Sequence, residues 1–157
     1  MENVAVHLVE TEADYAVLDN LLWQVLWAPL GLPRDVRSRF KVDGKLVQLL
    51  AMEGPYPVGG AVAIWKNIND AELRHLAVIP ANQGRGIGKE LVLKMINELK
   101  RRGCRELHTY ARDSSVAFFK KLGFNPATER LLDHEAYIKY GIAVRLMNKQ
   151  LSINCNS

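Results

Sequence analysis

The sequence predicts an α+β domain, a mixed and mostly antiparallel sheet flanked by helices. Two features lead to this fold class. Consecutive strand-like segments fill much of the first half of the chain, whereas strands and amphipathic helices alternate in the second half. The composition suits one globular domain, because 48% of the 157 residues are hydrophobic and 24% are charged.

The first half should begin with a strand at residues 4–9, where apolar and polar side chains alternate. A helix that Thr11 caps should follow it. Leucines spaced for one apolar face continue this helix toward Pro29, where it should stop. A break then leads into the next elements. These are a short helix at 34–40 and strands at 45–52, 57–65 and 71–78.

The second half should begin with a long helix. Its apolar residues recur every fourth position, as packing on a sheet requires, and they are Ile87, Leu91, Met95 and Leu99. Gly103 should end this helix. The elements expected after it are a strand at 105–111, a helix at 114–122 and strands at 123–128 and 141–149. We therefore expect a single domain over residues 1–150 and a frayed polar tail over 151–157.

A glycine-rich turn joins the strand at 71–78 to the long helix and reads Gln83-Gly84-Arg85-Gly86-Ile87-Gly88-Lys89. The free N–H groups of a helix N-terminus carry partial positive charge, so such a turn can hold a phosphate or pyrophosphate. Spacing excludes two known motifs. Glu90 stands where a P-loop needs Ser or Thr, and Lys89 stands where a dinucleotide fingerprint needs glycine. Neither ATP hydrolysis nor NAD chemistry is supported.

The spacing Gln83-x-x-Gly86-x-Gly88 resembles the coenzyme A pyrophosphate loop of the GNAT N-acetyltransferase superfamily. The run at 117–124 resembles the helix and K-L-G-F block of the same family. The resemblance implies a GNAT-like acyl-CoA N-acyltransferase fold. It also implies transfer of an acetyl group from acetyl-CoA to a primary amine of a small molecule or polypeptide, by direct attack in a ternary complex.

In the GNAT family two adjacent parallel strands splay apart and the pantetheine arm lies between them. The resemblance assigns this arrangement to the strands at 71–78 and 105–111. Main-chain groups of the first strand would pair with the arm, and N–H groups of the glycine turn would hold the pyrophosphate. The residues implied to bind acetyl-CoA or coenzyme A, the co-substrate, are Leu76, Ala77, Val78, Gln83, Gly84, Arg85, Gly86, Ile87, Gly88, Lys89, Asp113 and Phe119.

Acetyl transfer needs a base for the acceptor amine and a donor to the oxyanion. The resemblance assigns the base to Glu72 and the donor to a backbone N–H near Leu76. Phe119 stands where many family members have a tyrosine general acid, and a phenyl ring has no proton to give. Tyr110 or His108 could supply that proton instead, or coenzyme A could leave as a thiolate.

Strand alternation places His75 on the face opposite to Glu72 unless a bulge intervenes. Because histidine is intermediate in burial preference, a core or supporting role is expected for His75 rather than a catalytic one.

Trp23, Trp27 and Tyr56 could line an acceptor pocket, along with the segment Pro29–Pro33. The helical spacing of the two tryptophans is more typical of packing. By the same resemblance, the N-terminal helices and residues 125–140 should build the acceptor site.

A non-catalytic acyl-CoA-binding regulatory module is a second interpretation. Phe119 favours it, because the family's acid is missing at that position, and Glu72 opposes it.

Charge and composition limit the remaining classes of protein. The net charge of +4 is mild and the basic residues are scattered, so nucleic acid is not expected as a partner. Cys104 and Cys155 are too few for a disulfide framework or a metal site. A cytoplasmic protein without a membrane partner is expected, since neither a signal peptide nor a span-length segment is visible. The order of strands also permits a homodimer through the last strand or a sheet edge.

Overall fold

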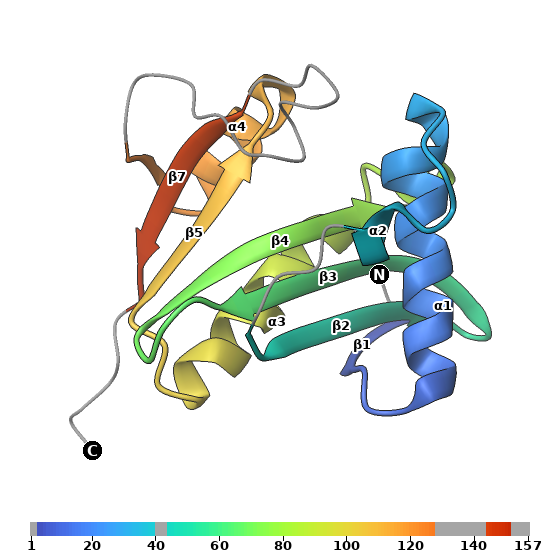
Figure 1. Ribbon diagram of the computed structural model, residues 1–157, viewed down its shortest axis with the longest axis horizontal. Coiled ribbons are helices and arrows are strands. Elements are labelled where there is room, and N and C mark those ends of the chain that lie inside the picture. Colours follow the sequence, from blue (N-terminus) through green and yellow to red (C-terminus); the bar gives the residue numbers. More distant parts are fainter. Residues whose placement is uncertain (1–2, 40–43, 128–143, 152–157) are drawn as a thin grey trace.

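The computed structural model of the protein describes residues 3–39, 44–127 and 144–151 (Figure 1). Its helices are α1 (Glu12–Leu22), α2 (Val36–Arg39), α3 (Ile87–Arg101) and α4 (Asp113–Lys121). Its strands are β1 (Val4–Leu8), β2 (Leu46–Glu53), β3 (Tyr56–Trp65), β4 (Asp70–Val78), β5 (Glu106–Ala111), β6 (Asn125–Pro126) and β7 (Arg145–Gln150).

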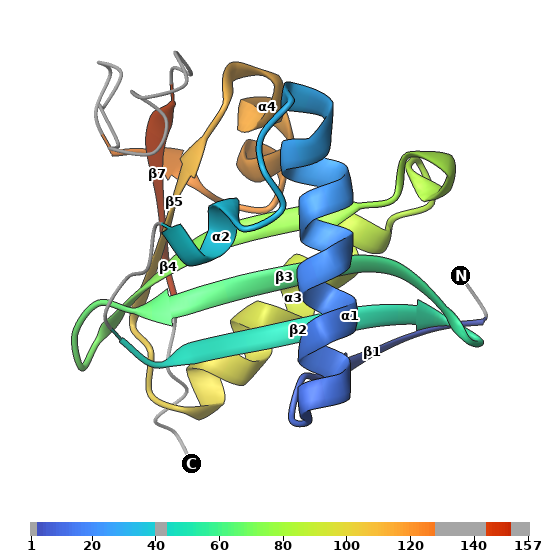
Figure 2. The ribbon, with the colours of Figure 1, turned by 45° about the vertical axis from the view of Figure 1, so that its right-hand side comes forward.

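The seven strands form one sheet in the order β1-β2-β3-β4-β5-β7-β6. Among the described strands β4 and β5 pair in parallel, and the other neighbours pair antiparallel. Helix α1 crosses one face of the sheet, and α3 lies against the other (Figure 2). The predicted mixed, mostly antiparallel sheet flanked by helices is therefore confirmed.

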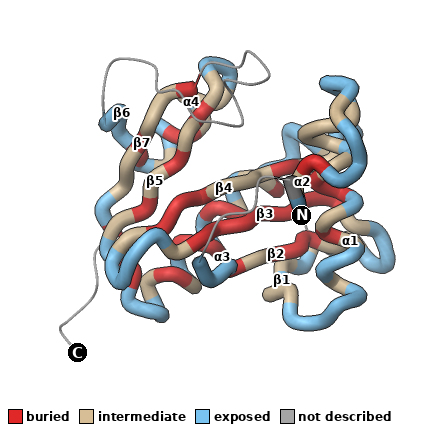
Figure 3. Tube along the Cα trace, viewed as in Figure 1, coloured by how far each residue is buried: buried red, intermediate tan, exposed pale blue. Residues whose placement is uncertain are grey.

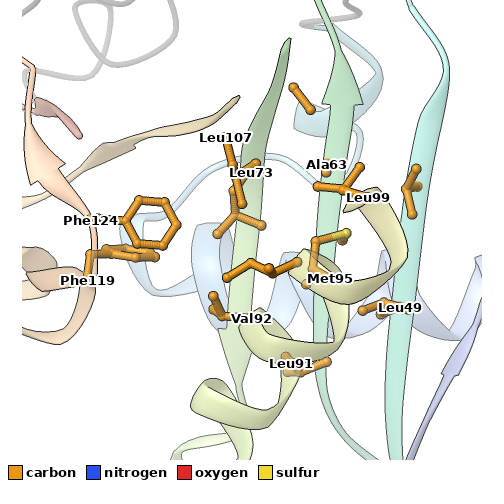
Figure 4. Packing of buried hydrophobic residues seen from close by; sticks show 14 of the residues in the cluster. Leu49, Ala63, Leu73, Leu91, Val92, Met95, Leu99, Leu107, Phe119 and Phe124 are labelled. Atoms are coloured by element: carbon orange, nitrogen blue, oxygen red, sulfur yellow. The ribbon is translucent and has the colours of Figure 1, made fainter. Parts of the chain in front are cut away.

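The larger core lies between the sheet and α3. Ile87, Leu91, Met95 and Leu99 are all buried, which confirms the every-fourth-residue pattern read from the sequence. They pack against sheet residues that point to the same side, among them Leu49, Ala63, Leu73 and Leu107 (Figure 4). Phe119 and Phe124 belong to the same cluster, so α4 is held to the sheet on the α3 side. Burial is concentrated in the central strands and in α3 (Figure 3).

A second apolar cluster holds α1 on the opposite face of the sheet. Leu18, Leu21 and Leu22 pack there against Leu50, Val62 and Ala77. The close approach of α1 depends on Gly60 in β3, because a Cβ at this position would overlap Leu18 Cδ1. This packing fixes the end of α1 beside β4, where the functional residues lie.

The first helix does not simply stop before Pro29. It widens into a π-helical turn (Trp23–Trp27) and tightens into a 3₁₀ turn (Ala28–Leu30). Gly31, with φ 74°, ends this segment in the left-handed conformation. Proline is tolerated because it occupies the first turn of the new 3₁₀ segment, where its missing N–H is not needed.

The predicted strand at 123–128 is shorter in the structure, where β6 covers Asn125–Pro126. Residues 123 and 124 end α4 instead of starting the strand. Gly123 has φ 91°, and Phe124 N donates to Phe119 O (3.0 Å). The last strand, predicted at 141–149, is described from Val144 onward, and residues 128–143 lie outside the described part.

Residue 151, the first of the predicted tail, packs in the core of the domain. Leu151 was assigned to the tail but is buried, and its N–H donates to Arg105 O (2.8 Å). Residues 152–157 lie outside the described part. In the described ranges no helix is both long and apolar enough to cross a membrane.

The contact of Gly60 with Leu18 gives a stability test. Gly60→Ala should lower the free energy of unfolding by about 1–3 kcal/mol through overpacking, and Leu18→Ala by about 2–5 kcal/mol through a cavity. The double variant should lose less than the sum, because the new methyl group enters the space that Leu18 leaves. Urea unfolding of the four proteins measures the coupling, and additive losses would contradict this packing.

Candidate functional site

The sheet opens between β4 and β5. Their parallel pairing runs from Asp70–Glu106 to Leu73–Thr109 and ends there, although β4 continues to Val78 and β5 to Ala111. At the last paired position the buried Thr109 hydroxyl donates a hydrogen bond to the Leu73 carbonyl (2.9 Å). Beyond this bond β5 and β7 turn away from β4 (Figure 1). The splayed strands expected from the resemblance are therefore present.

A bulge in β4 lies at the same point. Ala63 of β3 pairs with Leu73, and the next β3 residue, Val62, pairs with His75, so Arg74 is an extra residue. A one-residue insertion reverses the alternation of side chains beyond it. The expectation that Glu72 and His75 lie on opposite faces is therefore wrong, because both are on the α1 side. There the imidazole of His75 meets the indole of Trp27 edge to face, with 5.0 Å between ring centroids.

A cavity of about 220 Å³ occupies the opening. Its walls come from the end of the first helix, from β4 at the bulge, from the end of β5 and from α4. The residues that line it are Leu26, Trp27, Leu73, Arg74, His75, Leu76, Thr109, Tyr110, Ala111, Arg112, Ser114, Ser115, Phe118 and Phe119.

Four residues predicted from the sequence line this cavity, namely Trp27, Leu76, Tyr110 and Phe119. Phe119 is buried and packs on Phe118 and Phe124, at 5.0 and 5.2 Å between ring centroids. Asp113 does not line the cavity. Its carboxylate is exposed and accepts a bond from Arg145 Nε (3.2 Å).

The glycine turn has an open surface at the start of α3. Gly84 and Gly86 both have φ 82°, and a Cβ added to either would meet no atom within 4 Å. Gly86 is the N-cap of α3 and supplies no side-chain cap, so the N–H groups of the first turn keep their capacity to bind an anion. These features fit a pyrophosphate. Ile87 can contribute through its backbone, because its side chain is buried.

Two side chains of the turn have partners within the protein. Gln83 Nε2 donates to Val78 O (3.2 Å) and ties the turn to the end of β4. Arg85 forms two hydrogen bonds to the carboxylate of Glu53, at 3.1 and 2.8 Å. These bonds hold the pKa of the Glu53 carboxyl below its usual value. Sequence reasoning missed Glu53, because nothing in its neighbourhood signals that the β2–β3 hairpin lies beside this turn. Lys89 is exposed.

Glu72 is buried with two cations. The residue is 3% exposed, Lys66 Nζ lies 3.6 Å from one carboxylate oxygen, and Arg74 Nη1 lies 3.3 Å from the other. In the described part of the chain, Glu72 does not contribute to the cavity wall. The structure thus places the predicted base beside the bulge and behind Arg74.

Tyr110 and His108 lie on the same side of β5, with their rings 5.8 Å apart and edge to face. His108 Nδ1 lies 3.1 Å from Asp70 Oδ1, whereas Tyr110 lines the cavity. Burial, and after it the negative charge of Glu72, raises the pKa of the Tyr110 hydroxyl above its usual value. The hydroxyl therefore keeps its proton through the neutral range. Of the two candidate acids, Tyr110 is the one that the cavity exposes.

The π-helical turn separates the two tryptophans. Trp23 Nε1 donates to Leu32 O (3.2 Å), and the ring lies under the guanidinium of Arg34, so this tryptophan holds the chain after the first helix. Trp27 instead lines the cavity. The helical spacing of the pair gave no signal of this difference, because the widened turn changes the direction of the second side chain.

Comparisons with known proteins identify the same family that the glycine turn resembles. Residues 13–124 match the model of the acetyltransferase (GNAT) family. A ribosomal protein bS18-alanine N-acetyltransferase from Salmonella typhimurium is 39% identical over 111 residues, which are 69% of this chain and 75% of that protein. The same enzyme from Haemophilus influenzae is 40% identical over 60 residues, 37% of this chain and 41% of that protein. This second match spans less than half of the relative.

Solved structures share the fold at low identity. The ribosomal-protein-S18-alanine N-acetyltransferase from Escherichia coli superposes with a TM-score of 0.75 and 19% identity, covering 98% of this chain and 97% of that one. A GNAT family acetyltransferase from Elizabethkingia anophelis with acetyl-CoA bound gives a TM-score of 0.67 and 18% identity, covering 96% and 100%. With its splayed strands, its glycine turn and the match over residues 13–124, the chain belongs to the GNAT family of acetyltransferases.

Proposed function

We propose that this protein is an N-acetyltransferase that moves the acetyl group of acetyl-CoA to a primary amine while both substrates are bound. The observation that carries the proposal is the early end of the β4–β5 pairing at Leu73–Thr109, with a cavity in the opening. An unpaired strand edge offers N–H and C=O groups to the amides of a pantetheine arm.

The proposed binding site for coenzyme A, here called the cofactor seat, extends from the cavity to the start of α3. A Cβ at Gly88 would lie 3.6 Å from Phe118, which lines the cavity, so the turn and the cavity adjoin. Acetyl-CoA supplies the thioester that is attacked. The main chain at Leu76, Ala77 and Val78 would hold the pantetheine arm, and the N–H groups of the glycine turn would hold the pyrophosphate. A backbone N–H near Leu76 would donate to the oxyanion.

Tyr110 favours an enzyme over a non-catalytic acyl-CoA-binding module. Phe119 cannot protonate the leaving sulfur, but the Tyr110 hydroxyl lies in the same cavity wall and keeps its proton at neutral pH. The cavity therefore holds a proton donor although the family's usual position has lost its own. Glu72 as the base stays a prediction, as do a cytoplasmic location and a homodimer.

The names of the relatives suggest a first acceptor to test. They act on an alanine of a ribosomal protein, so a peptide with a free N-terminal alanine is the starting probe. Small amines such as spermidine form the comparison set.

Isothermal titration with coenzyme A tests the cofactor seat. Gly86→Glu should weaken binding about a hundredfold or more, because it strains a φ of 82° and places a carboxylate beside the pyrophosphate. Leu93→Glu is the control, since it places the same carboxylate on the exposed surface of α3, outside the turn. Equal affinity in the wild type and Gly86→Glu, or no binding by the wild type, would refute the seat.

Glu53→Gln should tighten coenzyme A binding about threefold to tenfold at low salt, because it releases Arg85 to pair with an anion. The depressed pKa of Glu53 means that the carboxylate is charged and competes throughout the neutral range. Titration at two salt concentrations measures the effect. Unchanged or weaker binding would show that Arg85, once released from Glu53, forms no ion pair with the cofactor.

Tyr110→Phe should lower kcat about tenfold to a hundredfold and leave KM nearly unchanged, since the hydroxyl is needed for proton transfer rather than for binding. Release of free thiol from acetyl-CoA with the alanine peptide measures the rate. Tyr56→Phe is the matched control, because Tyr56 is exposed and does not line the cavity. A Tyr110→Phe enzyme with full kcat would exclude Tyr110 as the acid.

A further inference from the structure

Deprotonation of the acceptor requires a group that both reaches the cavity and can take a proton at neutral pH. Within the described wall the ionisable side chains are Arg74, His75, Tyr110 and Arg112. An arginine does not lose its proton in proteins, so neither guanidinium can accept one. Tyr110 is protonated in this range because burial raises the pKa of its hydroxyl. Histidine is the remaining side chain, and imidazole is the usual proton acceptor near neutral pH.

We propose that His75 is the catalytic base of this enzyme and takes the proton from the ammonium group of the acceptor. The inference rests on the acetyltransferase function proposed above. Its basis is geometric, since the bulge at Arg74 turns His75 toward the α1 side and into the cavity wall. Without that extra residue the imidazole would face the α3 side of the sheet.

The π-helical turn fixes the imidazole in this position. Trp27 lies edge to face against it at 5.0 Å between centroids, and Trp27 itself lines the cavity. The base and the wall that receives the acceptor are therefore in direct contact. Both depend on one-residue irregularities, a bulge in β4 and a widened turn after α1, that bring two distant segments together.

Glu72 then acts as a positioning residue. Its carboxylate holds Arg74, the inserted residue of the bulge, at 3.3 Å, and is itself 3% exposed. Lys66 lies 3.6 Å from the other carboxylate oxygen. A carboxylate between two cations stabilises the bulge that presents His75, while His75 receives the proton.

The protons and electrons of the transfer balance with these residues. The acceptor ammonium gives one proton to neutral His75, and the freed nitrogen lone pair forms the bond to the thioester carbonyl carbon. The carbon–sulfur bond breaks, and its electron pair stays on sulfur. Tyr110 gives its proton to that sulfur and regains one from the acylated nitrogen, which leaves a neutral amide and the free thiol. Imidazolium then releases its proton to solvent, so each turnover yields one proton.

The test compares His75→Gln with the wild type over pH 6–9, using acetyl-CoA and the N-terminal alanine peptide. His75→Gln should lower kcat about a hundredfold to ten-thousandfold at pH 7. The residual rate should rise about tenfold per pH unit until the peptide amine loses its own proton near pH 8. The wild-type rate should rise less steeply over the same pH range, because the enzyme itself takes the proton from the amine. Affinity for coenzyme A, measured by titration, should stay within about threefold in both proteins.

Two further variants separate chemistry from structure. His7→Gln makes the same substitution on β1, away from the cavity, and should keep wild-type kcat. His75→Ala leaves a space beside Trp27 that free imidazole can enter, so added imidazole should restore part of the rate. A merely structural role for His75 would give no such recovery.

Three outcomes would overturn the inference, and they are distinguishable. Wild-type kcat in His75→Gln excludes this base while leaving the acetyltransferase function intact. A His75→Gln enzyme that keeps the wild-type pH profile, together with a loss of kcat of about a hundredfold or more in Glu72→Gln, assigns the base to Glu72 instead. Coenzyme A binding without acetyl transfer by the wild type, to the peptide or to spermidine, refutes the proposed function and the inference with it.

Discussion

The site depends on the point at which β4 and β5 cease to pair. The buried Thr109 hydroxyl bonds to the Leu73 carbonyl at the last paired position, and past it the strands separate. A buried carbonyl needs a hydrogen-bond partner, so this side chain takes over where the ladder ends. The opening then follows from the sheet itself. One wall is the free edge of β4, the other is the end of β5 with α4, and α1 holds the sheet from the opposite face through Leu18 and Gly60.

Two local departures from regular structure decide which side chains enter that opening. The bulge at Arg74 reverses the alternation of β4 and turns His75 toward the α1 side. The π-helical turn sends Trp27 to the same place while Trp23 stays with Leu32 and Arg34. Such irregularities cost backbone free energy and persist only when surrounding contacts fix them. Here those contacts are the ion pair of Glu72 with Arg74 and the edge-to-face packing of His75 on Trp27. Structural irregularity and candidate chemistry therefore coincide.

The sequence predicted the fold class, the order of the elements and the long helix well, because they follow from periodicity and from glycine positions. The glycine turn was also predicted in place, since positive φ at Gly84 and Gly86 is a local requirement. Long-range and one-residue effects were not predictable. Alternation cannot locate a bulge, so His75 was assigned to the wrong face. No local pattern brings Glu53 to Arg85 or buries Glu72 between Lys66 and Arg74. Leu151 was placed in the tail because its neighbours are polar, yet it pairs with Arg105 and fills the core.

Amide hydrogen exchange of the full chain, with and without coenzyme A, tests the central claim most directly. If the opened edge of β4 and the start of α3 form one cofactor seat, coenzyme A should slow exchange at Leu76–Val78 and at residues 86–89 together. Exchange at the backbone amides of β2 and β3 should change little. Protection at the glycine turn without protection along β4 would contradict the claim that the strand opening holds the pantetheine arm. Protection confined to other elements would contradict the seat as a whole.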